Sequence, residues 1–91
     1  MKYHTSYHAE QKRQEFVHLR QGSRSVAEYE ALFRELMEFA PDLVNTDERR
    51  CTKFEQGLRL QIRERLTMTR EPDLGHLLKQ AYRAEELVRF K

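Results

Sequence analysis

Residues 19–36, which read LRQGSRSVAEYEALFREL, constrain the fold more than any other part of the chain. They join a Gln-Gly turn to an amphipathic helix. The Ser25 side chain can accept a hydrogen bond from the backbone N–H of Glu28, and the Glu28 carboxylate can reach back to the N–H of Ser25. This pair predicts a capping box, whose cap is worth about 1 kcal/mol. Gly22, just upstream, can take the positive φ that a sharp reversal requires.

Apolar residues at spacings of three and four predict that this helix covers about residues 26–39. The apolar stripe should face the core, and Pro41 should end the helix, because the residue before a proline avoids the helical region. The stripe consists of Val26, Tyr29, Phe33 and Leu36, with Leu32 and Phe39 beside it.

One more helix is predicted before this one, and another after it. A helix over about residues 5–19, ended by Gly22, is so polar that it must pack through its C-terminal turn. Thr46 is the expected N-cap of a helix over residues 47–56, with Asp47 and Glu48 complementing the helix dipole. Cys51, Phe54 and Leu58 lie on one side of that helix.

The C-terminal third predicts two further helices. One runs over about residues 60–68, and the other from the turn at residues 71–73 to about residue 88. Few glycines and prolines and sparse β-branched residues favour an all-α fold. Five short helices with tight connections predict a compact orthogonal bundle, one domain over residues 1–91. The first of the two C-terminal helices carries the apolar residues Leu60, Ile62 and Leu66. The second is expected to bury Leu74, Leu77, Leu78, Ala81 and Leu87.

Charge and cysteine content limit the function classes. Lys and Arg total 17 against 15 for Asp and Glu, a balance that argues against an electrostatic nucleic-acid reader. The single cysteine rules out an internal disulfide and fits a reducing compartment. No apolar run approaches the roughly 18 residues of a membrane span. We therefore expect a small cytoplasmic module without a membrane partner.

Residues that could carry catalysis or bind a metal are few and isolated. Cys51 is expected on the core face of its helix, where a thiol packs as a small apolar group. His4 and His8 lie one helical turn apart, without a third ligand at a suitable spacing. The sequence also lacks a Cys/His knuckle and a phosphate-binding glycine loop. We expect no catalytic, cofactor or metal site, and no enzyme.

Two basic groups, Arg49-Arg50-Lys53 and Arg59-Arg63-Arg65, could bind phosphate. Glu48, Glu55 and Glu64 alternate with them, which favours a solvated surface of mixed charge.

Four aromatic residues lie near the chain ends on otherwise polar helices: Tyr3, Tyr7, Tyr82 and Phe90. Exposed aromatic side chains on so small a domain are candidates for a partner surface. The alternative is that the first and last helices pack together and cover these rings.

Five blocks in order carry a family resemblance: KY at residues 2–3 with QKRQEFVHLRQG at 11–22, SVAEYEALFREL at 25–36, FAPDLVNTDE at 39–48, KFEQGLRLQIR at 53–63, and the closing RAEELVRF. The ordered set resembles the capsid part of Gag from gypsy-type LTR retrotransposons, specifically its C-terminal lobe. In retroviral relatives this lobe contains the major homology region. Gln21, Gly22, Glu28, Tyr29 and Phe33 match its Gln-Gly, acid-aromatic and Phe pattern, with the acid offset by about one position.

The resemblance implies roles for the turn residues. Gln21 would bond backbone across the turn to the following helix, Gly22 would permit the turn, and Glu28 would anchor the start of that helix. Together they would preserve a lobe geometry needed for assembly.

The resemblance also implies a structural, non-enzymatic lobe that forms homodimers and contributes to virus-like shells. It would be joined to an N-terminal capsid lobe, with RNA present only as packaged cargo. The helix over residues 47–56 would contribute to a two-fold contact, with Arg49, Arg50, Thr52 and Lys53 as candidates beside the four terminal aromatic residues. The alternatives are a host-adopted adaptor domain that binds a protein or peptide, and an RNA-binding helical module, which the balanced charge disfavours.

Overall fold

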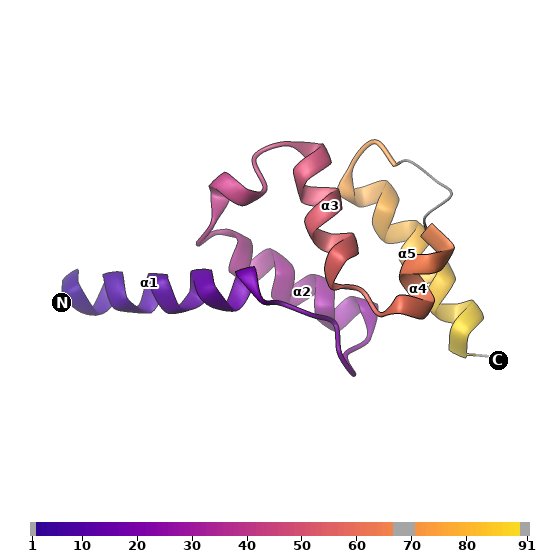
Figure 1. Cartoon of the computed structure of the whole chain (residues 1–91), viewed down its shortest axis with the longest axis horizontal. Coiled ribbons are helices and arrows are strands. Elements are labelled where there is room, and N and C mark those ends of the chain that lie inside the picture. The colour runs from indigo at the N-terminus through magenta and orange to yellow at the C-terminus, as the bar shows by residue number, and fades with distance from the viewer. Residues whose placement is uncertain (1, 67–70, 90–91) are drawn as a thin grey trace.

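The computed structural model describes residues 2–66 and 71–89, with side chains from residue 7 onward (Figure 1). All regular structure in this part is helical, so the predicted all-α bundle of five helices is confirmed. The helices are α1 (Lys2–Val17), α2 (Val26–Met37), α3 (Asp47–Gly57), α4 (Leu60–Leu66) and α5 (Leu74–Arg89). A short 3-10 helix, η1 (Pro41–Leu43), which we did not predict, lies between α2 and α3.

Helix α1 extends away from the other helices along the longest axis of the molecule (Figure 1). It ends at Val17, five residues before the predicted terminator Gly22. Its fully buried anchor is Phe16, near the C-terminal end, as the polar sequence predicted. A bidentate ion pair between Arg13 and Asp42, at 2.8 and 3.0 Å, holds α1 against η1.

Four aromatic rings join α1, α2 and α3 at the centre of the core. The Phe33 ring centroid lies 5.0 Å from that of Phe16 and 5.2 Å from that of Phe54. The ring centroid of Tyr29 lies 4.7 Å from that of Phe54. Edge-on and tilted contacts of this kind add to the free energy of burying the rings. The remaining buried side chains include Val26, Leu36, Val44, Cys51, Leu58, Ile62, Leu66, Leu74, Leu77, Leu78, Ala81 and Ala84.

Two apolar residues of the C-terminal helices are on the surface: Leu60 is 57% exposed, and Leu87, which we predicted to be buried, is 56% exposed. Leu60 is two residues from the buried Ile62, and this spacing places the two side chains on opposite sides of a helix. In α5, Ala84 is buried and Val88, four residues later, packs against the core, so Leu87 points away from it.

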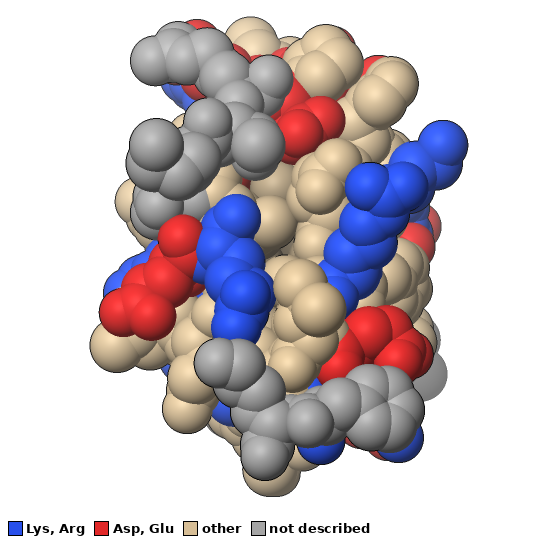
Figure 2. All heavy atoms as spheres, turned by 90° about the vertical axis from the view of Figure 1, so that its right-hand side faces the viewer, with Lys and Arg blue, Asp and Glu red and all other residues tan. Residues whose placement is uncertain are grey.

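Helices α4 and α5 form a closely packed pair, and α5 also contacts α2 and α3. On the face of the molecule at this end, basic and acidic side chains are interspersed (Figure 2). The α2 N-terminus is tied to α5 because the backbone N–H of Val26 donates to the Glu85 carboxylate at 2.9 Å. Asp73 accepts a hydrogen bond from the backbone N–H of His76 and so caps α5.

Candidate functional site

Gln21 is fully buried and connects two segments that are distant in sequence. Its backbone N–H donates to the Gly57 carbonyl at 2.7 Å. Its side-chain Nε2 donates to the Arg24 carbonyl, and its Oε1 accepts from the backbone N–H of Arg59, both at 2.9 Å. Gln21 therefore bonds backbone within its own turn, whereas the resemblance implied a bond across the turn to the following helix. Its long-range partners lie at the α3–α4 junction, however, and not on the following helix.

The turn and the start of α2 have the expected local geometry. Gly22 has φ +58°, the only positive φ among the described residues. Both hydrogen bonds of the capping box are present, at 3.1 Å from the Glu28 N–H to Ser25 Oγ and 2.9 Å from the Ser25 N–H to Glu28 Oε1. These contacts fix where α2 begins relative to the turn.

Tyr29 connects α2 to the end of α3. Its hydroxyl donates to the Phe54 carbonyl at 3.1 Å, and burial raises the pKa of the hydroxyl. The ring lies over Gly57, where a Cβ would come within 2.8 Å of the Tyr29 ring carbon Cζ. The sequence analysis did not identify this contact, because a glycine gives no local sign of what packs against it.

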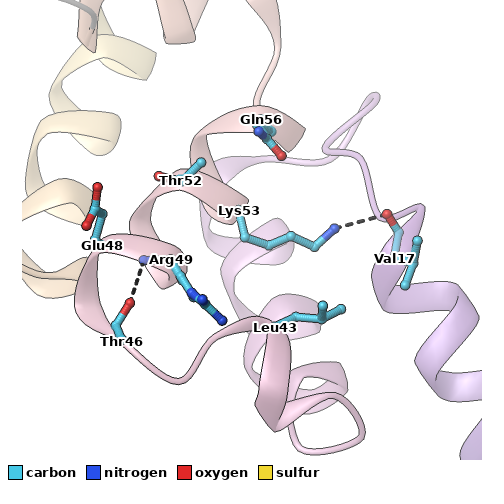
Figure 3. A pocket seen from close by; sticks show the side chains of 8 residues that line it. All are labelled: Val17, Leu43, Thr46, Glu48, Arg49, Thr52, Lys53 and Gln56. Atoms are coloured by element: carbon cyan, nitrogen blue, oxygen red, sulfur yellow. Dashed lines mark hydrogen bonds between the residues drawn. The ribbon is translucent and has the colours of Figure 1, made fainter.

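A groove of about 770 Å³ lies on the outer face of α3, beside the C-terminal end of α1 and η1 (Figure 3). Figure 3 shows Glu48 on one side of the groove, with Arg49 and Lys53 extending toward the other side, where Val17 and Leu43 lie. The groove is lined by Val17, Leu43, Thr46, Glu48, Arg49, Thr52, Lys53 and Gln56. Three of the four α3 residues that we proposed for self-association are thus in one place.

Lys53 is the best anchored of the groove residues. Its Nζ donates to the Val17 carbonyl at 3.0 Å and lies 5.0 Å from the centre of the Phe16 ring. Burial, and then the positive charge of Arg20, lower the pKa of Lys53. The Thr46 hydroxyl caps α3 by accepting from the Arg49 N–H at 3.0 Å.

The other candidate residues for self-association lie elsewhere. Arg50 pairs with Asp47 at 2.6 Å and does not line the groove. Tyr7 is 67% exposed on α1, and Tyr82 of α5 donates to Glu30 of α2 at 2.7 Å. Tyr3 lies in α1 with a side chain outside the described part, and Phe90 lies outside the described residues.

The alternative in which the first and last helices cover each other's aromatic rings is wrong for Tyr7 and Tyr82. Helices α1 and α5 lie toward opposite ends of the long axis (Figure 1). Tyr82 instead contacts α2, and its hydrogen bond to Glu30 raises its pKa to about 12.

A family model matches residues 12–88, and its description is PEG10/RTL1, C-terminal capsid-like domain. The chain belongs to this family. Comparisons with curated proteins and with solved structures gave no match. The match to the family model confirms the prediction that this chain is a Gag-derived capsid domain. The matched range contains every residue of the turn, the cap and the groove, and leaves out Tyr3, Tyr7 and Phe90.

Membership of the PEG10/RTL1 capsid-like family supports a structural role for this bundle. The described residues contain no group of three or more His, Cys, Asp or Glu placed to hold a metal ion. Cys51 is buried, and burial followed by the charges of Glu55 and Asp47 raises the pKa of its thiol. Within the described part of the chain, no helix has the length and apolar character needed to cross a bilayer.

Proposed function

We propose that the chain is a structural, non-enzymatic capsid lobe that forms homodimers and contributes to virus-like shells. Its family is capsid-like, and the α3 groove supplies a surface suited to pairing with itself. The proposed lobe acts in the cytoplasm beside an N-terminal capsid lobe, with RNA enclosed as cargo.

The arrangement of charge around the groove carries this proposal. A two-fold contact places the same patch on both copies, so a patch of one sign would repel itself. Here Glu48 lies on one side, and Arg49 and Lys53 extend toward the other (Figure 3). A two-fold axis near Thr52 would set Glu48 of one copy against the basic side of its partner.

Apolar surface in the same groove supports the contact. Val17 is 39% exposed although α1 packs against the core beside it, and Leu43 is only partly buried. Covering them would add hydrophobic free energy of about 25 cal/mol for each Å² removed from water. We expect a micromolar contact, about −8 kcal/mol, since shells are built from many weak and reversible contacts.

A charge exchange tests the contact. Glu48→Arg should make both sides of the groove basic and lower the dimer association constant at least about tenfold, because like charges then face each other. Adding Arg49→Glu to that variant should restore association. Glu86→Arg, which makes the same charge change on the exposed side of α5, is the matched control and should leave association unchanged.

Sedimentation velocity of the four proteins distinguishes the outcomes. If Glu48→Arg and Glu86→Arg lower the dimer association constant equally, the groove is not the contact. A natural chain that stays monomeric would favour the adaptor function, in which the same groove binds a peptide from another protein.

A further inference from the structure

Two segments that are distant in the sequence bring four arginine side chains together. Arg20 and Arg24 flank the Gln-Gly turn before α2, whereas Arg59 and Arg63 belong to the α3–α4 junction and to α4. The hydrogen bond between Gln21 and the Arg59 N–H, at 2.9 Å, holds these segments together. We call Arg20, Arg24, Arg59 and Arg63 the arginine cluster.

The hydrogen bonds within the cluster show how close these guanidinium groups are. Arg20 and Arg63 both donate to the carbonyl oxygen of Gln56, at 2.9 and 3.4 Å. Arg59 donates to the carbonyls of Gly22 and Arg24, each at 3.1 Å. Arg24 donates to the Arg20 carbonyl at 3.0 Å. The cluster therefore surrounds the turn and the last carbonyls of α3.

Among the described contacts, the hydrogen-bond acceptors of these arginines are backbone carbonyls and not carboxylates. Arg13, Arg34 and Arg50 form ion pairs with carboxylates, whereas the cluster residues donate to backbone carbonyls, which carry no net charge. The C-terminal end of the α3 dipole offsets only part of that charge. The positive charge of these arginines affects two neighbouring groups. Arg20 contributes to lowering the pKa of Lys53. Arg63 opposes the rise in pKa that burial causes at Glu55.

The cluster has unused hydrogen-bonding capacity. A guanidinium group carries five N–H donors in a planar fork, and the described contacts of each of these arginines use one nitrogen. The fork geometry matches phosphate, which it binds in a bidentate manner. Within residues 2–66 and 71–89, capping of carbonyls accounts for one nitrogen of each arginine and leaves the rest of the fork for a ligand.

We propose that the arginine cluster binds phosphate groups, either of a compact polyphosphate anion or of a nucleic-acid backbone. Sequence reasoning named Arg59 and Arg63 as possible phosphate ligands but grouped them with Arg65. It missed Arg20 and Arg24, because they lie at least 35 residues away from Arg59 in the sequence. The proposal does not depend on self-association, because none of the four arginine side chains lines the α3 groove.

Two charge-matched double variants test it. Arg20→Gln/Arg63→Gln removes two cluster charges and keeps an amide donor at each position, whereas Arg34→Gln/Arg50→Gln removes two arginines that are ion-paired. Isothermal titration calorimetry with sodium tripolyphosphate, at low salt, should show at least about tenfold weaker binding for the cluster variant. The control variant should bind as the natural chain does. Equal loss in both variants would overturn the proposal.

Amide chemical shifts of the unmodified chain give a second measurement that needs no variant. Tripolyphosphate should shift the amides of residues 20–25 and 56–63 before any others. Shifts spread over the whole surface, or no binding at all, would overturn the proposal even if the cluster variant fails to fold.

A fluorescent oligouridylate of about ten nucleotides identifies the source of the phosphate. Two results would indicate a nucleic-acid backbone. The affinity should rise as the oligonucleotide is lengthened, and a plot of the logarithm of the binding constant against that of the salt concentration should have a slope of about −0.7 for each phosphate contacted. Binding of tripolyphosphate but not of the oligonucleotide would indicate a compact anion. If neither binds and the cluster variant changes only self-association, the cluster is a protein contact and the proposal is wrong.

Discussion

The Oε1 atom of Gln21 accepts a hydrogen bond from the backbone N–H of Arg59, 38 residues later in the chain, at 2.9 Å. This bond holds the turn before α2 against the junction between α3 and α4. Helix α3 is the element that presents the proposed contact groove. The Gln-Gly turn and the proposed self-association surface are thus physically connected through the end of that helix.

Gln21→Ala should lower the free energy of unfolding by about 2–3 kcal/mol, because it leaves the Arg59 N–H and the Arg24 carbonyl without their partner. Urea unfolding measures the loss. Gln11→Ala, on the exposed side of α1, is the control and should cost no more than about 0.5 kcal/mol. Equal effects of the two substitutions would mean that the Gln21 contacts contribute little.

Gly57→Ala should cost about 2–3 kcal/mol, because the new methyl group would overlap the Tyr29 side chain. Gly75→Ala, where the nearest atom lies at 3.4 Å, should be neutral or stabilising by up to about 1 kcal/mol. The hydroxyl oxygen of Tyr29 is the atom nearest to a Cβ at position 57. In a Tyr29→Phe background, which lacks that oxygen, the loss of stability caused by Gly57→Ala should therefore be smaller. An unchanged penalty in that background would place the clash elsewhere.

Gly22→Ala should cost about 1–2 kcal/mol for a different reason, since Gly22 has φ +58° but no atom lies within 4 Å of a Cβ built there. The penalty comes from backbone conformation alone. Gly22→Asn should therefore be milder, because asparagine tolerates the left-handed region. Thermal unfolding of both variants checks the order, and a larger loss for asparagine would contradict it.

The ion pair between Arg13 and Asp42 should make stability depend on acid pH. The hydrogen bond from Arg13 lowers the pKa of Asp42 below its usual value of about 3.9. The ion pair therefore contributes fully to the stability of the fold above that value. This contribution is lost as the pH falls through the lower pKa that Asp42 has in the folded state. Arg13→Gln should reduce the drop in melting temperature between about pH 6 and pH 3. Lys79→Gln on α5, which removes the same charge, should leave the drop unchanged.

Local signals predicted the parts of the fold that depend on a few neighbouring residues. The Ser25–Glu28 cap, the Thr46 cap and the buried stripe of α2 act within one or two helical turns, so the spacing in the sequence was enough to find them.

The remaining features depend on tertiary contacts that no local pattern encodes. Tyr29 lies over Gly57, and Arg20 reaches the Gln56 carbonyl, although both pairs are far apart in the sequence. The exposure of Leu87 in place of Val88 depends on a small rotation of α5 against its neighbours, which periodicity alone does not fix.

Sedimentation equilibrium of the natural chain, over concentrations from well below to well above the micromolar range, tests most directly whether this lobe pairs with itself. We predict an average mass that rises smoothly from the 11.1 kDa monomer toward twice that value, with half-association near micromolar concentration. A constant monomer mass over the whole range would contradict the account.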